Sequence, residues 1–310
     1  MRAHVGGRPA AVLAAIAVLL SGTIASATST PATHVAAATP VDTAPARTKT
    51  PLSRRGPDIR SNAVLVIDES DSSVLLSKNA DVALPIASIT KLMTALVVVE
   101  ANLPLDEPIK FTKEDRDVLN GGPSRLTAGA TLSRGELLHL ALMSSENHAA
   151  HALGRTFDGG TTAILVAMNT KAKVLGMKRT HFNDTTGLST GNIASPEDLA
   201  KLVVAASQNP TIRKYSTDPD ETVRVGRYPV EYRNTNNLVR KPDWDIIVQK
   251  TGYTQAAGRC LVMKAVIEDR PVVIVLMNSF GKYTRVADAT RVRRWIEAES
   301  QPATLARTGK

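Results

Sequence analysis

The stretch PIASITKLMTALVVVE, residues 85–100, carries the most informative pattern in the chain. From Leu92 to Val99 it is almost wholly apolar, which is typical of a helix buried on all sides. Ser88 and Lys91 lie three residues apart at its start, so on a helix their side chains share one face and can meet. Backbone N–H groups at a helix N-terminus also favour developing negative charge. The stretch therefore predicts a core helix that presents a serine beside a lysine.

Strand-like runs lie on both sides of this helix, towards the two ends of the chain. Ala63–Ile67 and Ser73–Leu76 flank a short polar turn. Further on come Ile246–Gln249, Leu261–Ile267 and Val272–Met277, of which the last two are joined by a connection of hairpin length. We expect one antiparallel sheet built from both chain ends, with a large helical insertion packed on it, which is an α+β fold.

Helix boundaries within the insertion are marked by capping residues. Ser133 and Glu136 form a capping box ahead of an apolar run. Gly176 would end a helix that covers residues 163–175. Ser195 followed by Pro196 supplies an N-cap and a proline in the first helical turn.

Residues 1–27 have the features of a secretory signal peptide. Arg2 and Arg8 precede an apolar run over residues 10–20, and Ala25-Ser26-Ala27 is a small-x-small cleavage site. An uncleaved membrane anchor is the alternative, but Ser21-Gly22-Thr23 interrupts the run before it reaches the ~20 residues needed to span a bilayer. We expect a secreted protein of the cell envelope, either periplasmic or extracellular.

Residues 28–60 consist largely of Ala, Thr and Pro and predict a disordered linker, which leaves residues 61–310 as the folded domain. The net charge is +9, of which +4 belongs to residues 61–310. That balance is too weak for nucleic-acid binding, and no basic stripe with interleaved aromatic residues supports it. Cys260 is the only cysteine, so an intramolecular disulfide is excluded and a buried apolar role is expected.

Two more short motifs carry chemistry. Ser145-Glu146-Asn147 follows the apolar run 140–143, which would hold Ser145 rigidly at the end of a buried helix. Lys250-Thr251-Gly252 reads as the end of a strand, where glycine would let another backbone approach and a peptide could pair with the strand edge. A serine, a lysine and a hydroxyl–amide pair are the groups that a serine acyltransferase needs when it has no histidine base.

Lys91 can act as a base only when its pKa falls from the reference value of ~10.4. Burial against Leu92 and Met93, together with the positive field of Lys250, would lower it. The serine would then lose its proton to the neutral amine.

Three other patterns are weaker. Residues 187–191 match the Gly-x-Ser-x-Gly nucleophile elbow, but no convincing strand precedes them and no histidine follows. Residues 207–209 repeat Ser-x-Asn, and Pro210 marks them as a cap and turn. His148 and His151 share a helix face, yet a zinc site needs a third protein ligand that the sequence does not offer. We predict neither a metal nor a cofactor.

With its three motifs in this order, the chain resembles the low-molecular-mass penicillin-binding proteins, which are serine D-alanyl-D-alanine carboxypeptidases and related endopeptidases. The resemblance covers about residues 63–297 and includes the stretches 85–94, 183–188 and 250–254. It implies the DD-peptidase/β-lactamase-like fold. It also implies peptidoglycan stem peptides ending in D-Ala-D-Ala as substrates and β-lactams as covalent inhibitors.

The resemblance assigns a role to each residue of the motifs. The catalytic set is Ser88 as the acylated nucleophile, Lys91 as its base and Ser145 as the proton relay to the leaving group. The substrate-binding set is Asn147, Lys250, Thr251, Gly252, Tyr253 and Arg285. Within it, Asn147 would orient Lys91 and the substrate amide, and Lys250, Thr251 and Arg285 would bind the carboxylate side of the substrate. Backbone N–H groups of Ser88 and Tyr253 would form the oxyanion hole.

We expect from this a secreted serine D-Ala-D-Ala carboxypeptidase, with a peptidoglycan D,D-endopeptidase as the nearest alternative. A class A β-lactamase would need a deacylating glutamate in a Glu-x-x-x-Asn loop, whereas the glutamates in this region are followed four residues on by other types (Glu197 by Lys201, Glu221 by Val225, Glu231 by Thr235). A catalytically silent penicillin-binding sensor is the non-enzymatic alternative, and the intact motifs argue against it.

Overall fold

The computed structural model describes residues 56–117 and 124–300. The expected signal peptide, residues 1–27, lies outside the described residues, as does the expected linker up to residue 55. Residues 56–60 form no regular element. No helix within the two described ranges is long and apolar enough to cross a membrane.

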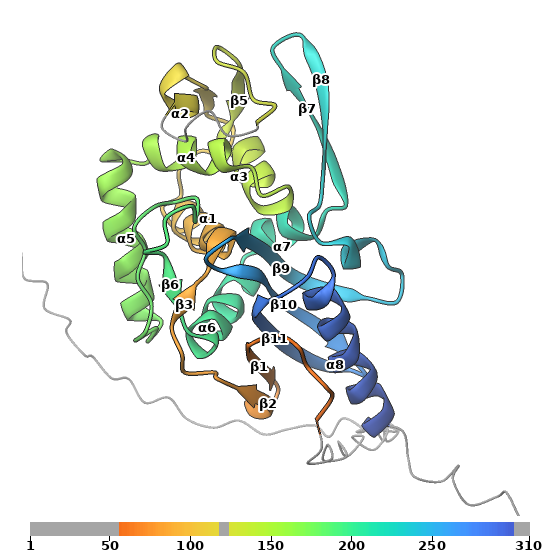
Figure 1. The fold of residues 1–310 in the computed structure, drawn as a ribbon. Helices are drawn as coiled ribbons and strands as arrows, with labels where there is room; N and C mark the ends of the chain where they lie inside the picture. Colours follow the sequence, from red (N-terminus) through yellow and green to blue (C-terminus); the bar gives the residue numbers. More distant parts are fainter. Residues whose placement is uncertain (1–55, 118–123, 301–310) are drawn as a thin grey trace, which may run out of the picture. The chain divides into compact units, whose positions relative to one another are not determined.

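A five-stranded antiparallel sheet has the order β2-β1-β11-β10-β9. Its strands are β1 (Ala63–Asp68), β2 (Ser73–Lys78), β9 (Asp245–Thr254), β10 (Gly258–Ile267) and β11 (Arg270–Ser279). Strand β1 pairs with β11 in the register Val64↔Leu276, so the two ends of the folded chain lie side by side in the sheet (Figure 1). This confirms the expected sheet built from both chain ends. The edge strand β9 carries the Lys-Thr-Gly motif.

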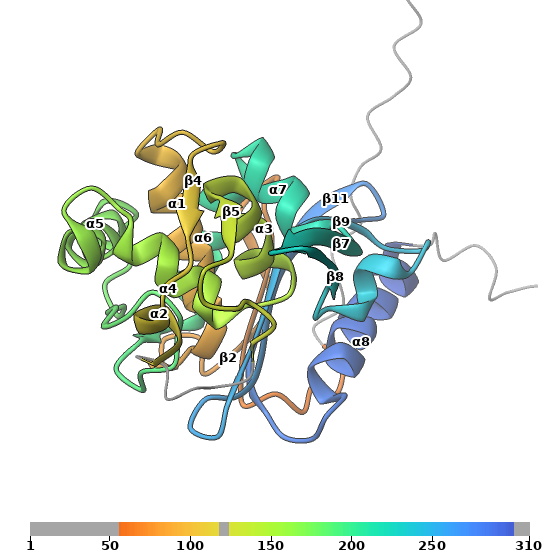
Figure 2. The same ribbon diagram turned by 90° about the horizontal axis from the view of Figure 1, so that it is seen from above.

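Helices cover both faces of the sheet (Figure 2). Helix α8 (Thr284–Ser300) places Ala289, Val292 and Ile296 in an apolar cluster with Leu261 and other residues of one sheet face. The opposite face packs against α6 (Pro196–Ser207), and β9 also contacts α7 (Pro210–Thr217) and the 3₁₀ turn η1 (Ala87–Ile89) directly. The α+β fold is as expected, because strands with apolar residues on both faces need a covering layer on each side.

Helix α1 (Thr90–Glu100) lies at the centre of the helical part, with Thr90 to Val98 buried. The other helical elements are the 3₁₀ turn η1 (Ala87–Ile89), α2 (Lys113–Asp117), α3 (Arg134–Met143), α4 (Asn147–Arg155), α5 (Gly160–Val174), α7 (Pro210–Thr217) and the 3₁₀ turn η2 (Asn237–Arg240). The predicted capping box at Ser133 and Glu136 and the cap at Ser195 are confirmed.

The insertion also contains short strand pairs that the sequence did not predict. They are β3 (Leu84–Pro85) with β6 (Ile193–Ala194), β4 (Pro108–Lys110) with β5 (Thr131–Ser133), and β7 (Asp220–Val225) with β8 (Tyr228–Arg233). The β7–β8 hairpin projects from the body of the fold (Figure 1). Its inward face holds Val223, Val225 and Tyr232, so only alternate positions are buried.

Candidate active site

Ser88 and Lys91 meet at the start of the central helix. Ser88 lies in η1, and Lys91 Nζ is 2.8 Å from Ser88 Oγ. The same nitrogen lies 2.7 Å from Asn147 Oδ1 and 2.6 Å from the carbonyl oxygen of Thr186. These two oxygens are acceptors only, so they take both hydrogens of a neutral amine. The lone pair of that amine is then directed at the Ser88 hydroxyl.

Burial sets the protonation of Lys91. The side chain is completely buried, and loss of solvation lowers its pKa from 10.5 to about 7. The carboxylates of Asp184 and Glu146 act in the opposite direction. The fall in pKa expected from burial is therefore found, whereas the field of Lys250 does not contribute to it. A substantial fraction of Lys91 is neutral near pH 7.

Ser145 occupies the turn between α3 and α4, with a positive φ of 62° that residues other than glycine rarely adopt. Its Oγ accepts a hydrogen bond from Lys250 Nζ at 2.9 Å. Glu146, the middle residue of this motif, caps α4 by accepting from the His148 backbone N–H. Asn147 is the first residue of that helix. The cap thus fixes the turn that holds Ser145 and Asn147 towards the two lysines.

The Lys-Thr-Gly motif lies inside strand β9, which continues to Thr254. The expectation that the motif ends a strand was wrong, because β9 goes on pairing with β10 beyond Gly252. Lys250 is completely buried, and its pKa is lowered well below the usual value by burial and by the charges of Lys91 and Arg285.

Gly252 allows β9 to approach η1. A Cβ at this position would lie 2.9 Å from the carbonyl oxygen of Ile86 and 3.3 Å from the backbone nitrogen of Ser88. The predicted close approach of a second backbone is therefore present. The neighbour is the chain's own serine-bearing segment.

Thr235 was not predicted as a site residue, and it links the end of α3 to strand β9. Its backbone N–H donates to the carbonyl oxygen of Met143 at 3.1 Å, at the end of α3. Its hydroxyl oxygen lies 2.6 Å from that of Thr251 on β9. No motif marks Thr235; the only signal in the sequence is a threonine shortly after β8.

The loop around Asp184 supports Lys91 from the other side. Asp184 Oδ1 accepts from the backbone N–H groups of Thr186 and Gly187, and its Oδ2 accepts from that of Ser189. Gly187 has φ +86°, and a Cβ there would lie 1.9 Å from the carbonyl oxygen of Ala87. Asp184 therefore folds the loop that presents the Thr186 carbonyl to Lys91. The stretch 183–188 had entered only through the resemblance.

Tyr253 and Arg285 lie near Gly252, the last residue of the Lys-Thr-Gly motif. The Tyr253 side chain is exposed, with the Arg259 guanidinium carbon 4.3 Å from its ring centroid. Arg285 Nη1 donates to the carbonyl oxygen of Gly252 at 2.8 Å. Burial and the nearby Arg259 lower the pKa of Arg285. Arg285 therefore holds the β9 backbone directly, a contact that the sequence did not predict.

The weaker patterns lie elsewhere. Ser207 ends α6 and Asn209 caps α7, as predicted for a cap and turn. His148 and His151 contact different carboxylates, those of Glu146 and Asp115 respectively. Cys260 is buried, as expected.

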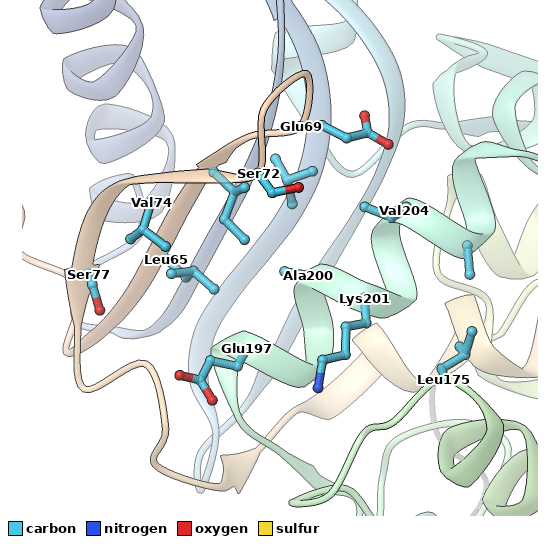
Figure 3. Close-up of a pocket in the computed structure, with 13 residues that line it drawn as sticks. Leu65, Glu69, Ser72, Val74, Ser77, Leu175, Glu197, Ala200, Lys201 and Val204 are labelled. Atoms are coloured by element: carbon cyan, nitrogen blue, oxygen red, sulfur yellow. The ribbon is translucent and has the colours of Figure 1, made fainter. Parts of the chain in front are cut away.

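A separate cavity of about 660 Å³ lies between the β1–β2 hairpin and α6. Figure 3 shows Leu65 and Val74 from the hairpin opposite Ala200 and Val204 from the helix. None of its lining residues belongs to the cluster around Ser88. We therefore take the Ser88–Lys91 cluster, where a serine hydroxyl and an amine of lowered pKa meet, as the candidate active site, and not this apolar cavity.

Comparisons with known proteins show the family to which the chain belongs. The D-alanyl-D-alanine carboxypeptidase family matches residues 48–281. A D-alanyl-D-alanine endopeptidase of Pseudomonas aeruginosa is 46% identical over 242 residues, covering 77% of this chain and 78% of the relative. One of Escherichia coli is 44% identical over 254 residues, covering 81% and 82%. A Streptomyces DD-transpeptidase crystal structure has TM-score 0.73 and 27% identity, covering 79% of this chain and 99% of that one.

The chain belongs to the D-alanyl-D-alanine carboxypeptidase family of serine peptidases, the low-molecular-mass penicillin-binding proteins.

Proposed function

We propose that this family member is a D,D-endopeptidase that cuts peptidoglycan cross-links through an acyl-enzyme on Ser88. The observation that carries the proposal is the hydrogen-bonding of Lys91 Nζ, whose two acceptor-only neighbours leave its lone pair for the Ser88 hydroxyl. A pKa of about 7 keeps this amine available as a base near neutral pH.

In the proposed acylation step, Lys91 takes the proton of Ser88 while the serine oxygen bonds to the carbonyl carbon of the D-alanine at the cross-link. The bond from that carbon to the leaving amine then breaks. Ser145, hydrogen-bonded to Lys250, passes its proton to the departing amine and regains one from the Lys91 ammonium, which returns Lys91 to its neutral form. Water subsequently attacks the ester carbon, which releases the shortened peptide and restores the Ser88 hydroxyl.

Negative charge on the carbonyl oxygen would be stabilised by the backbone N–H groups of Ser88 and Tyr253. The close packing of Gly252 against the Ser88 nitrogen supports this assignment, because it brings the neighbouring Tyr253 towards η1. Asn147 would orient both Lys91 and the substrate amide, and Lys250 and Thr251 would bind the carboxylate side of the substrate. None of these steps calls for a cofactor or a metal.

The sequence placed carboxypeptidase activity first, and the relatives change that order. Two relatives at 46% and 44% identity bear the name endopeptidase. Release of free D-alanine remains the second candidate, because the Lys250 amine and the Thr251 hydroxyl offer hydrogen-bond donors to a terminal carboxylate.

Turnover of β-lactams is disfavoured. Glu221 and Glu231 lie on the β7–β8 hairpin and Glu197 on α6, where it lines the separate cavity. A penicilloyl group on Ser88 would persist, so β-lactams would act as covalent inhibitors. We further propose that residues 1–27 export the protein and residues 28–60 tether a domain that comprises residues 61–310 in the cell envelope.

The test is incubation of the purified protein with a cross-linked muropeptide dimer and, separately, with a pentapeptide monomer, followed by mass spectrometry. Conversion of the dimer into monomers by the wild type, and its loss in Ser88→Ala, supports the endopeptidase. Release of D-alanine from the pentapeptide with intact dimers would replace it by the carboxypeptidase. Dimer cleavage by Ser88→Ala would overturn the proposed nucleophile.

A further inference from the structure

A groove, distinct from the cavity between the β1–β2 hairpin and α6, borders the site on the side of Ser145. Its volume is about 600 Å³, a size suited to a small ligand or a peptide segment. It is lined by Arg125, Ser144, Pro229, Val230, Glu231 and Arg233. These residues come from the loop after residue 123, from the α3–α4 turn and from β8. The groove is thus a place where three separate parts of the chain meet beside the catalytic turn.

The groove has a positive balance of charge. Arg125 contacts the Tyr232 ring, with 3.9 Å between its guanidinium carbon and the ring centroid, and its Nη1 donates to the carbonyl oxygen of Glu231. Arg233 Nε donates to the Glu231 carboxylate at 2.9 Å. The residues that line the groove therefore carry two positively charged guanidinium groups and one negatively charged carboxylate. An anionic group would be attracted there, most strongly at low ionic strength.

Tyr232 fixes the position of Arg125. Its side chain is only 1% exposed, so the ring is a rigid platform for the guanidinium. A planar cation held on an aromatic face loses little freedom when it binds a carboxylate. Arg125 is therefore ordered for binding although its guanidinium faces solvent.

The groove is connected through the chain to the residues assigned to the leaving group. Ser144, which lines it, precedes Ser145, the residue proposed to protonate the leaving amine. Two residues after Arg233, Thr235 contacts Thr251 in the Lys-Thr-Gly motif. Strand β8 thus leads from the groove directly to the part of the site assigned to the leaving residue. A substrate that extends beyond that residue has the groove as its continuation.

We propose that this groove binds the second stem peptide of a cross-link, with a carboxylate of that peptide held by Arg125 and Arg233. This inference rests on the proposed endopeptidase function. A cross-link differs from a free terminus in that the leaving amine carries a whole further peptide, which bears carboxylates of its own. Free D-alanine is too short to reach the groove. Arg125 and Arg233 are then specificity-determining residues for cross-linked substrate.

The test compares kcat/KM for a cross-linked dimer with the rate of acylation by a small labelled penicillin, which does not extend into the groove. Variants are Arg125→Gln, Arg233→Gln and both together. Arg227→Gln is the matched control, because Arg227 is an exposed arginine in the turn of the same hairpin and does not line the groove. Penicillin acylation also shows whether each variant is folded.

The expected result is a fall in kcat/KM for the dimer of about tenfold in each single variant, the effect of losing one charge-assisted hydrogen bond, and a larger fall in the double variant, with a much smaller change in penicillin acylation. The loss should appear mainly in KM and shrink as salt is raised. Equal dimer cleavage by the double variant and the Arg227→Gln control would overturn the groove while leaving the endopeptidase intact. If the wild type leaves dimers uncut, the proposed function fails, and the groove's role with it.

Discussion

The hydroxyl oxygens of Thr235 and Thr251 lie 2.6 Å apart, and the same Thr235 donates its backbone N–H to the carbonyl of Met143. Met143 is the last residue of α3, two positions before Ser145, whereas Thr251 belongs to β9. Thr235 therefore ties the turn that carries Ser145 to the strand that carries the Lys-Thr-Gly motif.

Replacing Thr235 by valine removes this hydroxyl and keeps the shape of the side chain. We expect kcat/KM for cross-linked peptide to fall by about tenfold, the effect of one lost hydrogen bond. Thr235→Ser should restore most of the activity because it returns the hydroxyl. Steady-state kinetics of the three proteins, with thermal unfolding to show equal stability, measures this. Equal losses in the valine and serine variants would contradict the role of the hydroxyl.

Glu146 should tune the pH at which Lys91 becomes a base. Its carboxylate raises the pKa of Lys91, which burial lowers to about 7. Because the neutral amine is the active form, acylation should rise with pH through this value. Glu146→Gln removes a negative charge that stabilises the ammonium, so the pKa falls further and the rising limb moves to lower pH.

The measurement is the rate of acylation by a labelled penicillin between pH 5 and 9. Glu100→Gln is the control, since Glu100 pairs with Lys171 at the surface and is not among the charges that shift Lys91. A shift of the Glu146→Gln profile to higher pH, or the same shift in the control, would remove the electrostatic explanation.

Gly187 should tolerate no side chain, for reasons of contact and of backbone conformation. A Cβ would lie 1.9 Å from the carbonyl oxygen of Ala87, and φ is +86°. Gly129→Ala is a matched control, because Gly129 has φ +90° and nothing within 4 Å of a Cβ. We expect Gly129→Ala to lower the free energy of unfolding by about 1 kcal/mol.

Gly187→Ala should cost at least about 2 kcal/mol, since the clash adds to the backbone strain. It should also slow acylation, because the loop could no longer present the Thr186 carbonyl to Lys91. Chemical denaturation and penicillin labelling of both variants measure this. If Gly187→Ala and Gly129→Ala had equal free energies of unfolding, the prediction would be wrong, because the contact with Ala87 would then be relieved without loss of stability.

Loss of Arg285 should slow dimer cleavage and penicillin acylation alike. Because it donates to the carbonyl of Gly252, its removal loosens β9 itself. We expect Arg285→Ala to reduce dimer cleavage and penicillin acylation by similar factors, about three- to tenfold. A loss confined to release of D-alanine from pentapeptides would show instead that Arg285 binds only a free terminal carboxylate.

The sheet and the central helix could be predicted because their signals are local. Long apolar runs such as Leu261–Ile267 predict buried strands, and residues 92–99 predict a helix buried on all sides. The β7–β8 hairpin was missed because its exposed charges hide the alternation of Val223 and Val225. The extent of β9 was missed because Gly252 resembles a strand end, although it marks the approach of η1.

The site was predictable only where residues fall into motifs. Ser88 and Lys91 are one helical turn apart, so their contact follows from spacing alone. Thr235 and Asp184 have no such signature, because their roles depend on which distant segments the fold brings together. The contact of Arg285 with a backbone carbonyl of β9 likewise depends on how α8 packs on the neighbouring strands β10 and β11, which no local pattern encodes.

Localisation of a penicillin adduct by mass spectrometry tests most directly that Ser88 is the nucleophile. After complete cleavage at Lys and Arg, Ser88 lies in the peptide 79–91 and is its only serine. We predict that the penicilloyl mass appears on this peptide and that Ser88→Ala abolishes it. An adduct on the peptide 180–201, which contains Ser189, or on the peptide 135–155, which contains Ser145, would contradict the assignment of Ser88.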